Sequence, residues 1–206
     1  MRLVSLRPSL GFLFGATLCL ALSPRPGGAA KDITIAHFFA RAVSVLDAKD
    51  AGPIEVRVLR WATDEELESL RGALLESSRG SALPVFRKSR PPMAVVFVPG
   101  VQALGARSRE RRALDCQFAR QFETPAGRQI VIATDIHLGI GENPRPSPAS
   151  GPEFTLLEIR LGPDGKGVGK LAPAAKVVYN KDKKIFEIED YEAQPVRLSD
   201  LRSQNP

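Results

Sequence analysis

The chain has 206 residues and a formal net charge of +6, with 29 lysines and arginines against 23 acidic residues. Three of these arginines fall within the first 30 residues, which contain no acid, so the rest of the chain carries a charge of only +3. Because this excess is mild and no aromatic residues are interleaved with the arginines, nucleic acid is excluded as the expected partner.

The N-terminal segment has the pattern of a secretory signal peptide. Arg2 and Arg7 precede an apolar run over 10–22, and small residues follow at 27–30. A charged start, an apolar stretch of roughly 7–15 residues and small residues at the cleavage point define such a peptide. A membrane span needs about 20 apolar residues. We therefore predict cleavage after Ala30, no transmembrane segment in the mature chain, and a secreted or periplasmic location.

Two strand-like segments and a helix are expected in the first half of the mature chain. Residues 33–45 are apolar and β-branched, which favours a strand, although a helix is an alternative. Residues 54–61 alternate apolar and charged side chains after a break at Gly52-Pro53. Thr63 and Glu66 then form a capping box, and the leucines that follow fall on one face of a helix. We expect this helix to lie on a sheet.

The remainder of the chain favours short antiparallel strands joined by tight turns. They are predicted at 93–98, 113–123, 128–135, 153–161, 168–179 and 185–198. The last three strands form a meander, because their connections are too short for parallel crossovers. The Pro- and Gly-rich residues 139–152 are incompatible with regular structure.

These elements predict an α+β fold that is mainly antiparallel β. We expect roughly seven or eight strands in a curved sheet or open barrel, with one capped helix packed on it and room for a second short one. A closed ligand-binding barrel of the lipocalin kind is the alternative architecture. The expected divisions are a signal peptide at 1–30, a single β-rich globular domain at 31–202 and a disordered tail at 203–206.

Three segments resemble a family of secreted bacterial proteins of unknown function. They are residues 60–74, 127–142 and 165–202, which contain a Trp-Ser/Thr-x-x-Glu helix start, a Gly-Arg strand and a closing hairpin ending in Pro-x-Arg-Leu. The resemblance implies secretion and a single domain. It assigns no activity, ligand or catalytic residue.

One weak catalytic candidate is the set Asp135, His137 and Glu142. On a strand, Asp135 and His137 share a face because side chains alternate, and Glu142 can return to that face across two glycines. Two carboxylates and an imidazole suit a divalent metal or an acid–base pair. Their spacing matches no standard zinc motif, however, and residues at a strand end more often cap backbone groups. We therefore assign no metal site here.

A dense basic segment is the second candidate, and it is a candidate for binding. It contains Arg107, Arg109, Arg111 and Arg112. Clustered arginines attract anionic surfaces such as lipid headgroups or phosphorylated envelope polymers. The alternative is a loop whose charges are simply solvated.

Two single residues have a structural interpretation. Cys116 is the one cysteine left after signal cleavage, and its alternating segment predicts a buried thiol. Trp61 stands where a strand meets the helix and is expected to fill the core.

The leading functional prediction is an extracytoplasmic β-rich module without catalysis or cofactor, which binds a small apolar ligand or an anionic envelope component. The alternative is a small metal-dependent or acid–base hydrolase centred on Asp135, His137 and Glu142, with 139–152 as a lid. A third hypothesis is a purely structural envelope protein that adheres through its arginines.

Overall fold

The computed structural model describes residues 33–43, 50–76, 82–88, 91–100, 111–137, 145–146, 154–180, 185–191 and 195–204. All of them fall in one unit, Asp32–Pro206. The expected signal peptide, Arg107, Arg109 and Glu142 lie outside the described residues. Among the described helices, none is long and apolar enough to cross a membrane.

The described residues form two helices and twelve strands. They are β1 (Ala36–Val43), β2 (Asp50–Val58), α1 (Asp64–Glu76), α2 (Leu83–Lys88), β3 (Ala94–Pro99), β4 (Arg111–Cys116), β5 (Phe118–Thr124), β6 (Gly127–Thr134), β7 (Ile136–His137), β8 (Arg145–Pro146), β9 (Phe154–Leu161), β10 (Lys166–Asn180), β11 (Ile185–Tyr191) and β12 (Val196–Gln204). The prediction of a mainly antiparallel β fold is confirmed.

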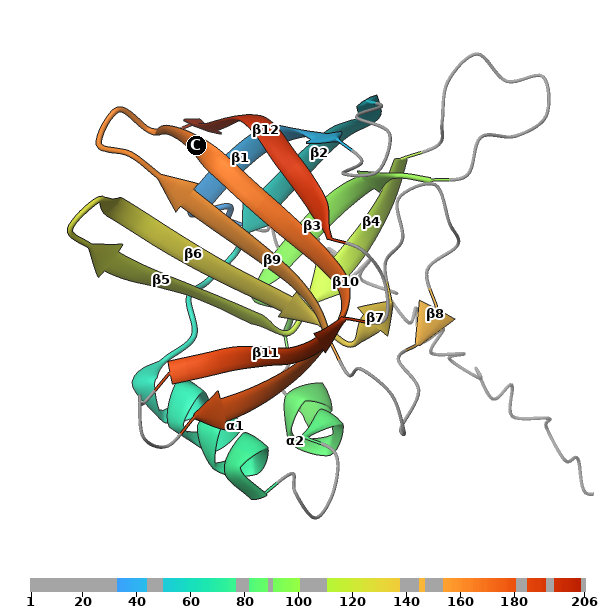
Figure 1. The fold of residues 1–206 in the computed structure, drawn as a ribbon, viewed down its shortest axis with the longest axis vertical. Helices are drawn as coiled ribbons and strands as arrows, with labels where there is room; N and C mark the ends of the chain where they lie inside the picture. The colour runs from blue at the N-terminus through green and yellow to red at the C-terminus, as the bar shows by residue number, and fades with distance from the viewer. Residues whose placement is uncertain are drawn as a thin grey trace, which may run out of the picture. The chain divides into compact units, whose positions relative to one another are not determined.

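Nine strands form one nearly closed, barrel-like sheet in the order β4-β3-β2-β1-β12-β10-β9-β6-β5 (Figure 1). The edge strands β4 and β5 are consecutive in the chain and are separated only by a bend at Gln117. A hydrogen bond also joins β6 to β4, because the Thr134 hydroxyl donates to the carbonyl of Asp115 at 3.0 Å. The bend at Gln117 therefore carries the chain from one edge of the sheet to the other.

The strand count exceeds the expected seven or eight partly because two predicted strands are bent into separate elements. The segment 113–123 divides into β4 and β5, and 185–198 divides into β11 and β12. The long strand β10 pairs with β12 through its first half and with β11 through its second half. A sheet that closes on itself needs such corners, because its strands must tilt and turn. Side-chain alternation alone does not reveal them.

Two further boundaries differ from expectation. β2 begins before the Gly52-Pro53 break. Gly52 has a φ of 117°, a backbone conformation in which any residue with a side chain would be strained. The register between β1 and β2 shifts at this point, so the glycine accommodates an irregularity within the strand. At the other end, β12 continues to Gln204, and the Ser203 amide donates to the carbonyl of Gly165 at 2.9 Å.

Alternate side chains from the strands fill the interior of the sheet. On β2, Ile54, Val56 and Val58 are buried, as the alternation predicted. The predicted capping box begins α1, because the Glu66 amide donates to the Thr63 hydroxyl at 3.2 Å and the Thr63 amide donates to the Glu66 carboxylate at 2.9 Å. α1 and α2 lie at the same end of the barrel (Figure 1).

The two single residues also have the predicted structural roles. Cys116 is free and 1% exposed, and burial raises the pKa of its thiol well above the ordinary value. Trp61 is half-buried against the core.

Candidate functional site

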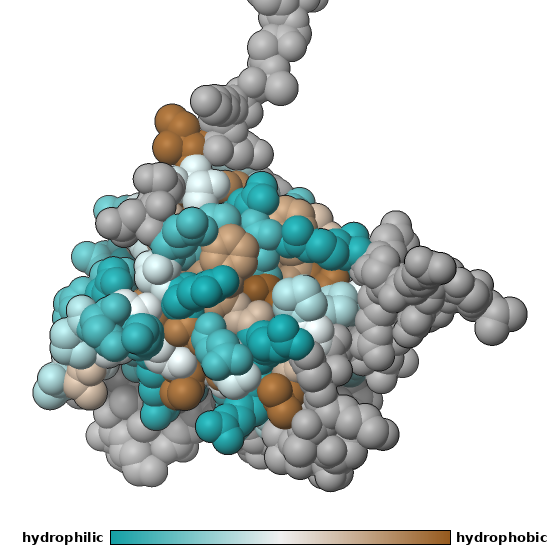
Figure 2. Space-filling view, turned by 90° about the horizontal axis from the view of Figure 1, so that it is seen from above, coloured by the Kyte–Doolittle hydropathy of each residue, from teal (hydrophilic) through white to brown (hydrophobic). Residues whose placement is uncertain are grey.

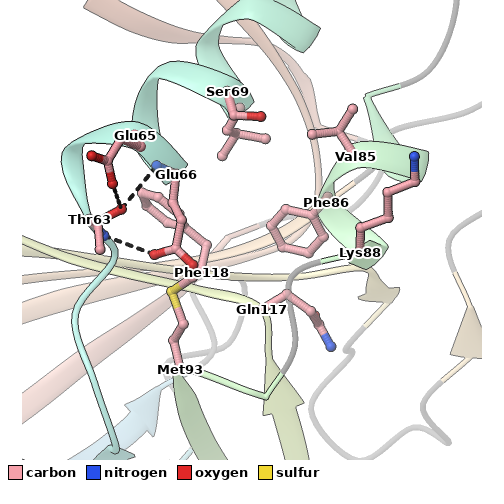
Figure 3. Close-up of a pocket in the computed structure, with 11 residues that line it drawn as sticks. Thr63, Glu65, Glu66, Ser69, Val85, Phe86, Lys88, Met93, Gln117 and Phe118 are labelled. Carbon is pink, nitrogen blue, oxygen red and sulfur yellow. Dashed lines mark hydrogen bonds between the residues drawn. The ribbon is translucent and has the colours of Figure 1, made fainter.

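A cleft of about 480 Å³ lies where α1, α2 and the end of the barrel meet (Figure 3). Ser69 of α1 and Val85 of α2 lie on opposite sides of it, and Phe86 lies between α1 and α2, above Gln117. Residues of α1, which begins at Asp64, and of α2, which begins at Leu83, line the cleft together with Met93, Gln117 and Phe118.

The floor of the cleft is apolar and closely packed. Phe86 is 2% exposed, Met93 0% and Phe118 7%, and all three line the cleft. The ring of Phe86 meets that of Phe154 edge to face, with centroids 4.9 Å apart and an interplanar angle of 64°. Since edge-to-face pairs are a favoured aromatic geometry, this contact fixes the ring that forms the floor.

The α1 wall carries a carboxylate whose oxygens are already occupied. Arg60 donates one hydrogen bond to each carboxylate oxygen of Glu66, both at 2.9 Å, and the Thr63 amide donates a third. The Arg60 guanidinium and the Thr63 amide lower the pKa of Glu66 against the opposing effect of burial. Glu66 is therefore ionised at neutral pH and holds the start of α1 in place.

An ion pair anchors the α2 wall to the barrel. Arg87 Nε donates to the Asp135 carboxylate at 2.6 Å, and the Asp135 side chain is only 16% exposed. Asp135 stands at the bend between β6 and β7, so the two residues link α2 to the end of β6. This contact sets the position of the helix that carries Val85 and Phe86.

Gln117 is the polar group at the base of the cleft. Its side chain lines the cleft although the residue is only 3% exposed, and its Oε1 finds no donor among the residues that the structure describes. A buried acceptor without a hydrogen bond costs about 1–3 kcal/mol. A carboxamide both accepts and donates, so Gln117 is complementary to a polar group on a bound molecule.

The structure does not bring the predicted catalytic residues together on one strand. Asp135 lies at a bend between β6 and β7 and not within a strand, so the strand alternation from which a shared face with His137 was expected does not apply to it. Asp135 is instead paired with Arg87, and His137 is buried at 4% exposure in the small β7–β8 sheet. No group of three metal-ligating side chains occurs among the described residues.

The predicted basic loop is only partly described, and its described part is not a loop. Arg111 and Arg112 begin β4, and the Arg111 guanidinium donates to the carboxylate of Glu55. The same guanidinium lies 5.0 Å from the ring centroid of Phe97. The nearly buried carboxylate of Glu55 thus holds the Arg111 guanidinium against the outer surface of the sheet. The sequence had instead suggested that Arg111 belongs to a loop.

Sequence reasoning missed the cluster around Glu55. Glu55 is only 6% exposed, although the alternation of β2 places it on the opposite face of the strand from the core residues. Arg57 Nε donates to it at 2.7 Å, and His37 Nε2 lies 2.8 Å from the same oxygen. Burial by itself raises the pKa of Glu55, but hydrogen bonds from Arg111, Arg57 and His37 outweigh it and hold the pKa at about 2. The one local signal was the Glu-x-Arg spacing, which is also typical of a solvated strand face.

No protein-family model, curated protein or solved structure matches this chain. The resemblance to a secreted bacterial family therefore stays a prediction.

Proposed function

We propose that the mature chain, residues 31–206, is an extracytoplasmic binding protein without catalytic activity. Its ligand is a small, mainly apolar molecule that carries an N–H or O–H donor, and it occupies the cleft between α1, α2 and the barrel end. The observation that carries this proposal is Gln117, an almost fully buried carboxamide at the base of an apolar cleft, whose Oε1 accepts no hydrogen bond from the described residues.

The size and the chemistry of the cleft support a small ligand. Ligand sites commonly have volumes of about 300–1,000 Å³ and combine apolar walls with a few polar groups. Contact with Leu70 and Val85, which line the cleft and are only partly buried, would remove apolar surface from water, which contributes about 25 cal/mol per Å². The carboxamide of Gln117 would then select molecules with a matching polar group.

Binding is favoured over catalysis by the state of the reactive side chains near the cleft. A general acid–base group works best when its pKa lies near the operating pH. The pKa of Glu66 is lowered and therefore moved away from neutrality. The thiol of Cys116 is buried with a raised pKa, whereas a nucleophilic cysteine needs an accessible thiolate.

Secretion is the second half of the proposal, and it rests on the sequence of residues 1–30. The positive start, the short apolar run and the small residues before Lys31 are the support for it. The described fold lies entirely downstream of the predicted cleavage point, so processing would leave it whole.

A fluorescence titration with N-phenyl-1-naphthylamine tests the cleft, because this probe joins an apolar body to a single N–H donor. We expect saturable binding to residues 31–206. Ser69→Trp, which fills the cleft from α1, should abolish it, while Glu68→Trp on the same helix should not. Gln117→Leu should fold normally and weaken binding roughly three- to tenfold, the range for one net hydrogen bond. Equal binding by Ser69→Trp and wild type contradicts the proposal.

A further inference from the structure

A second surface, away from the cleft, gathers arginines on the outside of the sheet. We call it the arginine face and define it as the outward side chains of β1–β4 and β12, including Arg41, Arg57, Arg111, Arg202, Phe39 and Phe97. Cross-strand pairing places Phe39 beside Arg202 on one side and beside Glu55 on the other, and Glu55 beside Phe97. This row therefore crosses four strands, and the pairing of Phe97 with Ala113 extends it to β4.

The central arginines of this face are held in position. Arg57 and Arg111 both bind Glu55, and their guanidinium carbons lie 4.8 and 5.0 Å from the ring centroid of Phe97. Their side chains nevertheless remain 46% and 54% exposed. Glu55 thus orders two cations at the surface, and one carboxylate compensates only one of the two charges.

Positive charge prevails on the arginine face as a whole. Arg41, Arg197 and Arg202 are exposed on β1 and β12, which flank the central cluster. Among the described side chains of β1–β4 and β12, the exposed carboxylates are those of Asp115 and Asp200, so the described arginines outnumber the described acids even with Glu55 included. A surface of this kind attracts an anionic partner.

Apolar side chains continue the arginine face at the start of β1. Ile33 is 77% exposed and Ile35 42%, and they belong to the large hydrophobic residues that are exposed in the described structure. Ile35 lies on the same outward side of the chain as His37 and Phe39, two and four residues further on. Its amide donates a hydrogen bond to the Val58 carbonyl at 2.7 Å. Figure 2, which looks onto the end where β1, β2 and β12 lie, shows hydrophilic side chains interspersed with hydrophobic ones.

We propose that the arginine face, together with Ile33 and Ile35, docks onto the surface of a bilayer that contains anionic lipids. The arginines match the phosphate headgroups, and each cation near such a surface contributes noticeably to binding. Exposed isoleucines have no partner on a soluble polyanion, whereas they can enter the boundary between headgroups and acyl chains. This combination favours a lipid surface over a dissolved polyanion.

Vesicle co-sedimentation tests the docking surface. Residues 31–206 are used because the apolar residues 10–22 would bind vesicles by themselves, and the described barrel lies wholly within Asp32–Pro206. We expect binding to vesicles of phosphatidylglycerol and phosphatidylcholine at about 0.1 M salt, and little binding at about 1 M salt, where charges are screened. Equal binding to vesicles of phosphatidylcholine alone would overturn the proposal.

Charge variants locate the contact. Arg202→Glu should weaken vesicle binding about tenfold or more, since it removes one cation and adds an anion. The matched control is Arg160→Glu on β9, whose side chain is 69% exposed and which lies outside the arginine face. Equal losses in both variants would show a general charge effect and would overturn the proposal.

Apolar variants separate a bilayer from a soluble polyanion. Ile33→Ser with Ile35→Ser should also weaken vesicle binding, whereas Val168→Ser, at 50% exposure on β10, should not. If the double variant binds vesicles like wild type, and heparin competes in a manner that depends on Arg202, the partner is a soluble polyanion and the lipid proposal is wrong. Probe binding in the cleft should remain intact in all these variants, so the two proposals fail separately.

Discussion

The carboxylate of Glu55 accepts a hydrogen bond from the guanidinium of Arg111, 56 positions further along the chain. Pairing of β2 with β3 and of β3 with β4 brings the two residues together, and the ring of Phe97 lies beside the contact. This relationship orders part of the arginine face, and it also couples the stability of the fold to pH.

Acidification should destabilise the protein through Glu55. Its pKa is about 2 in the folded state, below the ordinary value of 4.5. The unfolded chain therefore binds this proton more readily, so the contribution of Glu55 is complete above pH 4.5 and is lost as the pH falls toward 2. The contribution amounts to about 3 kcal/mol, since one pKa unit corresponds to roughly 1.4 kcal/mol.

Urea unfolding of wild type and Glu55→Gln across this pH range measures that contribution. The difference in unfolding free energy between them should shrink by about 3 kcal/mol from pH 6 to pH 2. Glu68→Gln is the control, because Glu68 is 53% exposed. A difference that stays constant with pH would contradict the assignment.

Removal of the helix cap should destabilise α1. In Thr63→Ala the Glu66 amide loses the hydroxyl that accepts its hydrogen bond, and such losses cost about 1 kcal/mol. Thr63→Ser keeps the hydroxyl and should retain nearly all of the stability. Urea unfolding followed by circular dichroism measures both variants, and similar losses in both would rule out the cap as the cause.

Loss of the Arg87–Asp135 ion pair should weaken binding in the cleft although the pair contributes little to the free energy of unfolding. Arg87 is 45% exposed, so we expect a coupling energy below about 1 kcal/mol in a double-mutant cycle of Arg87→Ala and Asp135→Ala. Either variant should nevertheless weaken binding of N-phenyl-1-naphthylamine, because the pair positions α2. Unchanged probe affinity in both variants would show that α2 keeps its place without the pair.

The thiol of Cys116 should be inert in the folded protein. It is 1% exposed and its raised pKa keeps it protonated, whereas the thiolate is the reactive form. We expect no reaction with Ellman's reagent at pH 8 until urea unfolds the protein, and then one thiol per mature chain. Rapid reaction under native conditions would contradict this burial.

Signal cleavage should produce a chain that begins at Lys31. Expression of the full chain in a bacterium with an outer membrane, followed by periplasmic extraction and intact-mass measurement, tests this expectation. Replacement of Leu10 and Leu20 by Arg interrupts the apolar run and should keep the precursor in the cytoplasm, because the run is the element that is recognised. Export of that variant at the wild-type level would contradict the signal-peptide interpretation.

Local patterns in the sequence were sufficient for those features that depend on near neighbours. The capping box of Thr63 and Glu66 lies within one helical turn, and the alternation of Ile54, Val56 and Val58 lies within one strand. Each follows from side-chain chemistry over a few residues, so the α1 helix, the β2 face and the buried Cys116 were predictable.

The tertiary structure alone decided the features that join distant segments. The bend at Gln117 turns one predicted strand into two opposite edges of the sheet, and it leaves the Gln117 carboxamide at the base of the cleft. Glu55 received His37 and Arg111 as partners only through the register of β1, β2, β3 and β4. Strand pairing and corners are set by packing between segments far apart in sequence, which a periodicity of two along one strand does not encode.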